Sequence, residues 1–189
     1  MTVAARYRLI FALLFAISGS AALLPVAQAQ SQYASPRLDE AFATLKTAQT
    51  EQAAQAAADA IWILWLNPPD PELARRMGDI IALRQTGDFP AILALLDQLV
   101  VDYPDYAEAW NQRATVYFLL GNYERSLADI TKVLEFEPRH FGALAGRAVI
   151  YKTQGKQDLA LQDMIAASAI HPFLVERGLF PELKDTIAI

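Results

Sequence analysis

The residues of this chain that could bind a metal or transfer a proton are few. His140 and His171 are its two histidines, and they lie far apart in the sequence. A metal site needs three or four converging ligands, and no second histidine lies within a helical turn of either residue. Each histidine lies near a proline at an expected helix end, where a cationic side chain would complement the helix dipole. The pattern predicts no metal site.

Motifs of catalysis are also missing from the sequence. Residues 142–146, "GALAG", begin an expected helix and do not follow a strand, as a phosphate-binding or dinucleotide-binding loop would. There is no Gly-x-Ser-x-Gly nucleophile elbow, and no serine is paired by motif with a histidine. The absence of cysteine excludes disulfides and thiol catalysis. We therefore expect a protein that is not an enzyme and that has no cofactor.

The charge balance argues against two kinds of partner. The 189 residues carry a formal net charge of −5, which becomes −7 if the N-terminal segment with its two arginines is removed. Nucleic acids and anionic lipids attract basic surfaces, so neither is an expected partner.

The N-terminal segment, residues 1–29, has the pattern of a signal peptide. Arg6 and Arg8 precede an apolar run over residues 9–17, and the small-x-small sequence Ala27-Gln28-Ala29 follows. Cleavage there would export a chain that begins near Gln30, after which residues 30–35 form a short linker. The alternative is an uncleaved membrane anchor, since residues 18–26 could extend the apolar run towards a bilayer span.

The elements that must position any site follow a repeating pattern. Gly87, Gly121 and Gly155 recur at a constant spacing, and Pro104, Pro138 and Pro172 recur at the same spacing. Between a glycine and the next proline, "GNYERSLADITKVLEFEP" has apolar residues at helical spacing. One such helix cannot bury its own apolar face, so a stack of similar units is expected.

This pattern resembles the tetratricopeptide repeat (TPR). Residues 107–140 match the family at Trp110, Ala114, Tyr117, Gly121, Tyr123, Leu127 and Pro138. Residues 141–172 match at Leu144, Ala148, Tyr151, Gly155, Ala160, Ala167 and Pro172, and residues 73–106 match less closely. The resemblance implies an all-α fold, a right-handed superhelical stack of antiparallel helix hairpins.

Two further segments are expected to extend the stack. Residues 36–71 form a degenerate N-terminal hairpin, in which Trp62 and Trp65 pack against the helix that starts near Pro71. The alternative for these tryptophans is an aromatic binding platform. Residues 173–189 form a C-terminal helix that caps the last hairpin, as repeat arrays require.

The repeat also places charged residues in pairs. Arg113 and Arg147 occupy equivalent positions, and Asp129 and Asp163 follow them at equal distances along the chain. Family members with arginine at the first position often carry aspartate at the second, so the resemblance implies the ion pairs Arg113–Asp129 and Arg147–Asp163. Their even spacing disfavours a catalytic role for the carboxylates.

The resemblance further implies a concave groove, lined by the first helices of successive units, that holds a segment of another protein. Some family members clamp a carboxylate terminus in this groove, but the clamp residues are not present here. The alternative is that the N-terminal hairpin or the C-terminal cap covers the apolar residues of the groove, so that it is not open. By position, the expected groove residues are Met77, Ile81, Arg84, Asn111, Thr115, Phe118, Val149 and Lys152, with Glu108 and Gly142 beside them.

Taken together, the sequence predicts an interaction module of a bacterial periplasm or envelope that binds a partner protein through its concave groove. The alternative is an assembly factor anchored in the inner membrane by an uncleaved N-terminal helix.

Overall fold

A computed structural model describes residue 33 and residues 35–183. The predicted signal peptide over 1–29, most of the linker and the end of the predicted cap, residues 184–189, lie outside these residues. Within the described part all regular secondary structure is helical, which confirms the all-α prediction. The helices are α1 (Pro36–Thr47), α2 (Glu51–Leu66), α3 (Pro71–Arg84), α4 (Phe89–Asp102), α5 (Ala107–Leu119), α6 (Tyr123–Phe136), α7 (Phe141–Thr153) and α8 (Gln157–Ile170), followed by the 3-10 helices η2 (Val175–Leu179) and η3 (Pro181–Leu183).

Local chemistry explains where these helices begin and turn. Asp70, Asp88 and Asn122 cap α3, α4 and α6, because each side chain accepts a hydrogen bond from a backbone N–H of the first turn. The turns inside the three stacked hairpins each contain a glycine with φ near 71°, the left-handed conformation that other residues rarely adopt. Gly121 is one of the three. The constant spacing of the glycines therefore reflects a recurring tight turn.

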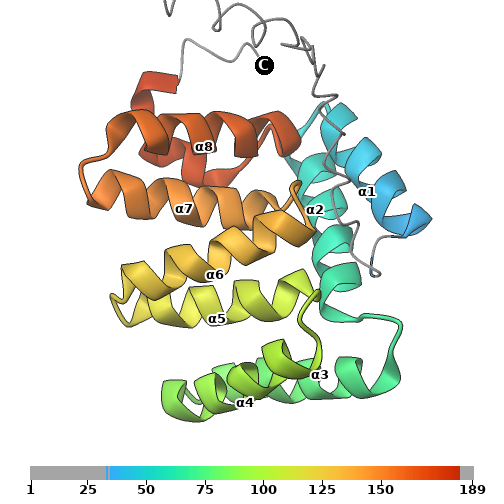
Figure 1. Cartoon of the computed structure of the whole chain (residues 1–189). Coiled ribbons are helices and arrows are strands. Elements are labelled where there is room, and N and C mark those ends of the chain that lie inside the picture. Colours follow the sequence, from blue (N-terminus) through green and yellow to red (C-terminus); the bar gives the residue numbers. More distant parts are fainter. Residues whose placement is uncertain (1–32, 34, 184–189) are drawn as a thin grey trace, which may run out of the picture.

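Three hairpins, α3–α4, α5–α6 and α7–α8, lie one above another in Figure 1. Neighbouring hairpins meet mainly where the second helix of one contacts the first helix of the next, α4 with α5 and α6 with α7. This arrangement buries one apolar face of each helix between successive hairpins, as in repeat proteins generally. The stack is the architecture that the sequence predicts.

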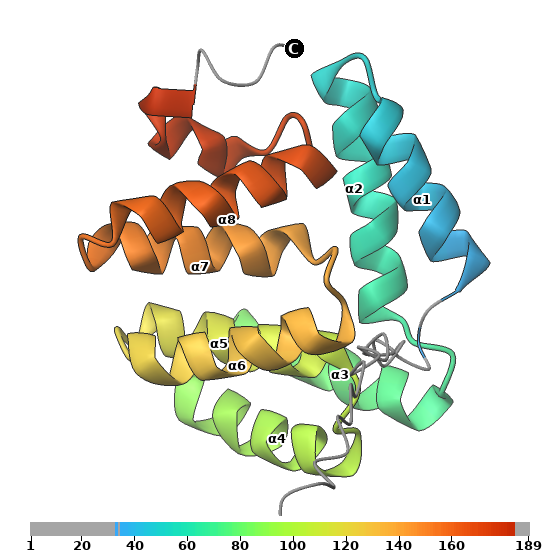
Figure 2. The ribbon, with the colours of Figure 1, turned by 45° about the horizontal axis from the view of Figure 1, so that its top comes forward.

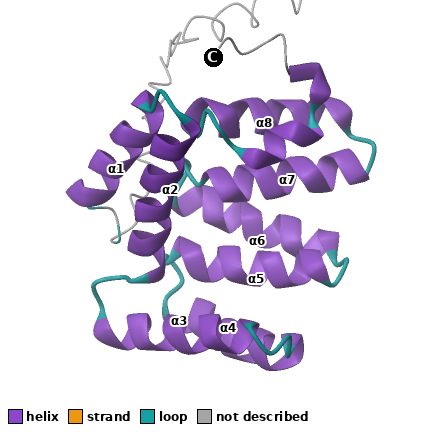
Figure 3. Ribbon diagram, turned by 180° about the vertical axis from the view of Figure 1, so that it is seen from behind, coloured by secondary structure: helices purple, strands orange, loops and turns teal. Residues whose placement is uncertain are grey.

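The N-terminal hairpin, α1–α2, does not continue this stack. It lies across the ends of the other hairpins, with α2 steeply inclined to the six helices that follow (Figures 1, 2 and 3). Trp62 and Trp65 contact His140 and Phe141 at the start of α7. The prediction that these tryptophans pack against the helix starting near Pro71 is therefore wrong.

The start of α7 has room for these rings because residue 142 is a glycine. A Cβ atom on Gly142 would lie 2.9 Å from the ring of Trp62, which is closer than side chains tolerate. The Trp65 carbonyl also accepts a hydrogen bond from the buried Tyr106 hydroxyl, at the start of α5. The N-terminal hairpin is thus attached both to the middle hairpin and to the last one.

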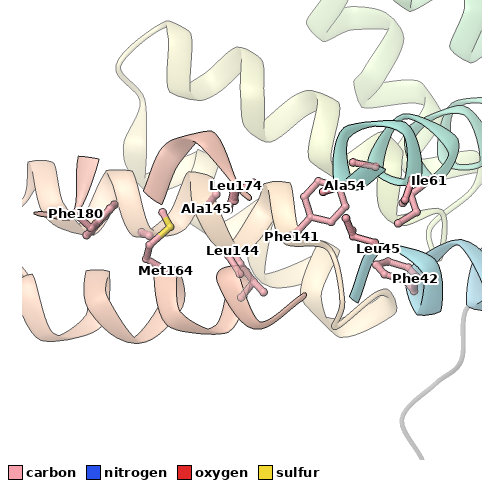
Figure 4. Packing of buried hydrophobic residues seen from close by; sticks show 14 of the residues in the cluster. Phe42, Leu45, Ala54, Ile61, Phe141, Leu144, Ala145, Met164, Leu174 and Phe180 are labelled. Atoms are coloured by element: carbon pink, nitrogen blue, oxygen red, sulfur yellow. The ribbon is translucent and has the colours of Figure 1, made fainter. Parts of the chain in front are cut away.

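One continuous apolar core joins the N-terminal hairpin to the last hairpin and to the segment that follows α8, as far as Leu183. Figure 4 shows Phe42 and Ile61 of this hairpin beside Phe141 of α7, with Met164 and Phe180 further along the same cluster. Burial of such side chains contributes about 1.5–3 kcal/mol each, so this core accounts for much of the attachment.

The segment after α8 caps the stack, but not as the continuous helix that the sequence predicts. Residues 175–183 form two short 3-10 helices, which bury Phe180 and Leu183 against the last hairpin. Gly178 and Pro181 explain the interruption, because glycine weakens a helix and proline lacks the N–H that an α-helix needs.

Candidate binding groove

A groove of about 310 Å³ lies between α5 and α7, with α6 beneath it. Its lining is mainly apolar, and within the part of the chain that the structure describes its single ionisable side chain is contributed by η2. We refer to it as the α5–α7 groove. It is lined by Asn111, Ala114, Thr115, Phe118, Ser126, Ile130, Gly142, Ala143, Gly146, Val149, Ile150 and Glu176.

Small residues on α7 give this groove its depth. At Gly146 an added Cβ would meet only the Ile130 side chain, at 4.0 Å, so the position is open. Leucine or a longer side chain there would fill the space between the two helices. The groove is therefore open at this point because residue 146 has no side chain.

Five of the residues predicted for the groove line it: Asn111, Thr115, Phe118, Gly142 and Val149. Met77 was predicted there as well, but its side chain is fully buried against α4 and α5, so that prediction is wrong. Ile81 is half-buried against the same core and does not line the groove. The first hairpin thus contributes its apolar face to the core and not to the groove.

The two predicted basic groove residues are engaged elsewhere. The guanidinium group of Arg84 donates a hydrogen bond to Gln112 Oε1 at 2.8 Å. Lys152 donates through Nζ to the Leu179 carbonyl, and its ammonium group lies 4.6 Å from the centre of the Phe180 ring. The C-terminal segment therefore binds the Lys152 side chain. Neither Arg84 nor Lys152 lines the groove.

A buried carboxylate orients the main polar group of the groove. Glu108 was expected on the groove surface, but it is 1% exposed, and that expectation is wrong. Both carboxylate oxygens accept from Asn111 Nδ2, at 3.2 and 3.3 Å, and one accepts from Gln112 Nε2 at 2.5 Å. Since the Asn111 amide nitrogen faces Glu108, its carbonyl oxygen is the atom available to a ligand.

His140 belongs to the same buried network. Its Nδ1 accepts from the Ala143 N–H at 3.1 Å and so caps the start of α7. The other ring nitrogen, Nε2, lies 3.0 Å from Glu108 Oε2, so the neutral tautomer with the proton on Nε2 satisfies both contacts. The ring stacks on Trp65 with centroids 4.0 Å apart.

The sequence interpretation that places His140 at a helix C-terminus is therefore wrong, because the residue caps the N-terminus of α7. The His140 ring lies against the first turn of α7, because the chain turns after Pro138. There it supplies an acceptor to one of the first N–H groups of α7, which have no partner within the helix. A signal for this contact exists in the sequence. The separation of Glu108 and His140 is close to one repeat, so the two residues fall at the starts of successive hairpins.

Both arginine–aspartate pairs implied by the repeat are present, and both are structural. Arg113 donates two hydrogen bonds of 2.8 Å to Asp129, and a third to Asp97 at 2.9 Å. Arg147 donates to Asp163 at 2.7 and 2.8 Å. Hydrogen bonding to the aspartates raises the pKa of each arginine, against the opposing effect of burial. Neither pair lines the α5–α7 groove.

The other positions of the repeat pattern serve the packing of the stack. Ala114 and Ala148 are buried where their hairpin helices meet, and Tyr117 is 8% exposed. Trp110 and Tyr151 are partly buried against neighbouring cores, as is Tyr123. Pro138 and Pro172 lie in the loops after the second helices.

His171 is the second histidine, at the end of α8. Burial lowers its pKa below the ordinary value of 6.5, while the nearby Glu176 acts weakly in the opposite direction. Within the described residues no cluster of His, Cys, Asp and Glu could hold a metal ion. Nor does any helix there have the length and apolar character to span a bilayer.

The fold and the groove define a class of protein, the helical repeat proteins that present a concave surface. The family model "Tetratricopeptide repeat" matches residues 107–140, which confirms the resemblance. The chain is a member of the tetratricopeptide repeat family.

Several relatives carry the same family name. A TPR repeat-containing protein of Rhizobium etli is 37% identical over 126 residues, covering 67% of this chain and 62% of the relative. The TPR repeat-containing protein YvcD of Bacillus subtilis is 24% identical, covering 57% of this chain and 22% of the relative. Tetratricopeptide repeat protein 36 of Danio rerio is 27% identical, covering 53% and 58%. The chain thus spans less than two thirds of each relative.

Proposed function

We propose that this protein is a non-enzymatic interaction module that binds a segment of a partner protein in the α5–α7 groove. Membership of the tetratricopeptide repeat family supports protein binding as the general function. The observation that carries the choice of surface is the groove itself, an apolar channel with one oriented amide, Asn111. Apolar grooves with a few fixed polar groups suit helical or extended segments of other proteins.

The orientation of Asn111 favours a ligand with a free N–H group near the middle of the groove. Its carbonyl oxygen can accept one hydrogen bond, while Phe118 and Val149 provide apolar contact on either side. A backbone N–H of an extended segment meets this requirement without any particular side chain. The apolar contacts would then provide the affinity, and the Asn111 side-chain amide would fix the position of the segment along the groove.

Site-specific photocrosslinking tests this proposal. A photoreactive phenylalanine analogue at Thr115, inside the groove, is compared with the same analogue at Val101, an exposed residue of α4. We expect a discrete crosslinked partner from position 115 that is lost when Asn111→Ala and Phe118→Ala are added. Crosslinks of equal strength from both positions, or crosslinks that survive the double substitution, would place the binding surface elsewhere.

We also propose that the protein acts in the cell envelope, as an exported periplasmic chain. The support is the sequence pattern of residues 1–29, with two arginines, an apolar run and a small-x-small cleavage sequence. The second candidate is an assembly factor that keeps this segment as a membrane anchor, which the further apolar residues 18–26 favour. Cell fractionation with N-terminal sequencing separates them: a soluble chain starting near Gln30 supports export, and a membrane-bound chain starting at residue 1 supports the anchor.

A further inference from the structure

We infer that the α5–α7 groove is specific for a partner segment that places a lysine or arginine among apolar residues, with Glu176 as the residue that selects the cation. This inference rests on the proposed function of the groove. It adds the chemical class of the ligand, which the apolar lining alone does not define.

Charge complementarity is the first argument. Of the described residues that line the groove, Glu176 is the single ionisable one. It is half-buried, and it takes part in no ion pair or hydrogen bond with any described residue. A carboxylate held at the edge of an apolar groove without a partner loses solvation when a ligand covers it. A basic side chain on the ligand restores the lost interaction, whereas an apolar or acidic one does not.

Within the described residues, the cations of α7 and η2 are already engaged. Lys152 donates to the Leu179 carbonyl, Arg177 to the Pro172 carbonyl, and Arg147 to Asp163. His171 lies close enough to interact with Glu176, but burial lowers the pKa of this histidine, so its ring is neutral at neutral pH. The positive charge that complements Glu176 is thus left for the ligand to supply.

The shape of the groove matches the stem of a long basic side chain. Gly142 and Gly146 line the same groove as Glu176 and present little beyond backbone, and Val149 adds an apolar wall. The methylene groups of lysine or arginine can lie along such a surface while the charged end reaches a carboxylate at its edge. The same features disfavour a ligand anchored by its C-terminal carboxylate, because no cation is found among the described residues that line this groove.

A synthetic peptide library tests the inference on the protein purified after expression of the full chain. One position of each peptide is lysine, norleucine or glutamate, and the other positions are drawn from leucine, valine, alanine and serine. Norleucine is the matched control, because it keeps the length of lysine without the charge. Binding is measured by fluorescence polarisation at low and high sodium chloride.

We expect the lysine peptides to bind best and to lose roughly fivefold in affinity with Glu176→Gln, the effect of one partly exposed ion pair. Glu176→Lys should reverse the order, so that glutamate peptides bind best. The control Glu40→Lys makes the same charge change at an exposed position of α1, outside the groove, and should leave the order unchanged. High salt should reduce the advantage of lysine over norleucine.

Each other outcome overturns a defined part of the proposal. Groove-dependent binding with equal affinity for lysine and norleucine overturns the inference but leaves the proposed function intact. If no peptide binds in a way that Phe118→Asp abolishes, both are overturned. A peptide of residues 4–14 of this chain, which places Arg6 and Arg8 beside apolar residues, is included as well. Preferential binding of that peptide would identify the occupant as the chain itself and overturn the assignment to a partner.

Discussion

The helices of the first stacked hairpin meet differently from those of the two hairpins that follow. In α5–α6, Ala114 faces Ser126, whose hydroxyl donates to the Ala114 carbonyl at 2.8 Å, and Ala148 and Ala160 hold the equivalent positions in α7–α8. In α3–α4 both positions are isoleucine, Ile80 and Ile92. All six side chains are buried.

The size of these residues sets how closely the paired helices approach. Helices α5 and α6 lie close together over much of their length, as do α7 and α8, whereas α3 and α4 do so over less of theirs. The first hairpin also lacks the arginine–aspartate pair, because Asp79 and Leu95 occupy those positions. A single repeat spacing therefore supports two kinds of hairpin, one with a small-residue contact and an ion pair, and one with a bulkier apolar interior.

The largest effect on stability is expected when an alanine inside the third stacked hairpin, α7–α8, is replaced by the isoleucine found at the equivalent position of the first, α3–α4. Ala148→Ile inserts a branched side chain where two alanines meet, and we expect it to destabilise the protein by about 3 kcal/mol. Thr153→Ile, on the exposed side of α7, is the control and should change stability little. Urea unfolding measures both. Equal losses for the two variants would contradict the role of the small-residue contact.

The next effect distinguishes the two ion pairs. Asp163→Ala leaves Arg147, whose side chain is 24% exposed, without its carboxylate, and we expect a loss of about 2 kcal/mol. Asp129→Ala should cost only about 1 kcal/mol, because Arg113 keeps its bond to Asp97. Thermal melts of both variants, with Glu124→Ala as an exposed control, test the order. A larger loss for Asp129→Ala would show that the Asp97 bond does not compensate.

A smaller effect is expected when the second hairpin is given the interior of the third. Ser126→Ala removes the hydrogen bond to the Ala114 carbonyl but keeps a small side chain, as at Ala160. We expect a loss of less than about 1 kcal/mol in urea unfolding. Ser126→Ile is the counterpart that should cost more, since it adds bulk at the same place. Equal values for the two would mean that the hydroxyl, and not the size, controls this contact.

The smallest effect concerns the end of the stack. Because burial lowers the pKa of His171 in the folded protein, the unfolded chain binds more protons as the pH falls below about 6.5. Stability should therefore be full at higher pH and decline through this range. His171→Gln removes the titrating group and should make the decline shallower in thermal melts between neutral and mildly acidic pH. An unchanged slope would contradict this assignment.

The repeat spacing predicted much of this structure. It placed the stacked helices, the glycine turns at positions such as Gly121, and the pairing of Arg147 with Asp163, because each depends on contacts that recur within a hairpin. It also placed Phe118 and Val149 in the groove. The predicted ion pairs and groove residues that were found share one property: they lie in α5–α6 and α7–α8, the two hairpins with the closer match to the repeat pattern.

The predictions failed where contacts do not recur. The register of the repeat continues through Trp62 and Trp65, yet their location depends on His140 and Gly142, far along the chain. Met77 was assigned to the groove by position, but in the bulkier first hairpin that position faces the core. No periodic signal reports such contacts, because each occurs once.

Gly142 has a consequence for how the molecule responds to a ligand. Its backbone lines the α5–α7 groove on one side and touches the Trp62 ring on the other. Proximity of this kind would couple the two sites only if ligand binding displaced this stretch of backbone, and the coupling would then be reciprocal. The missing side chain at position 142 thus places the groove and the docked hairpin against the same short stretch of α7.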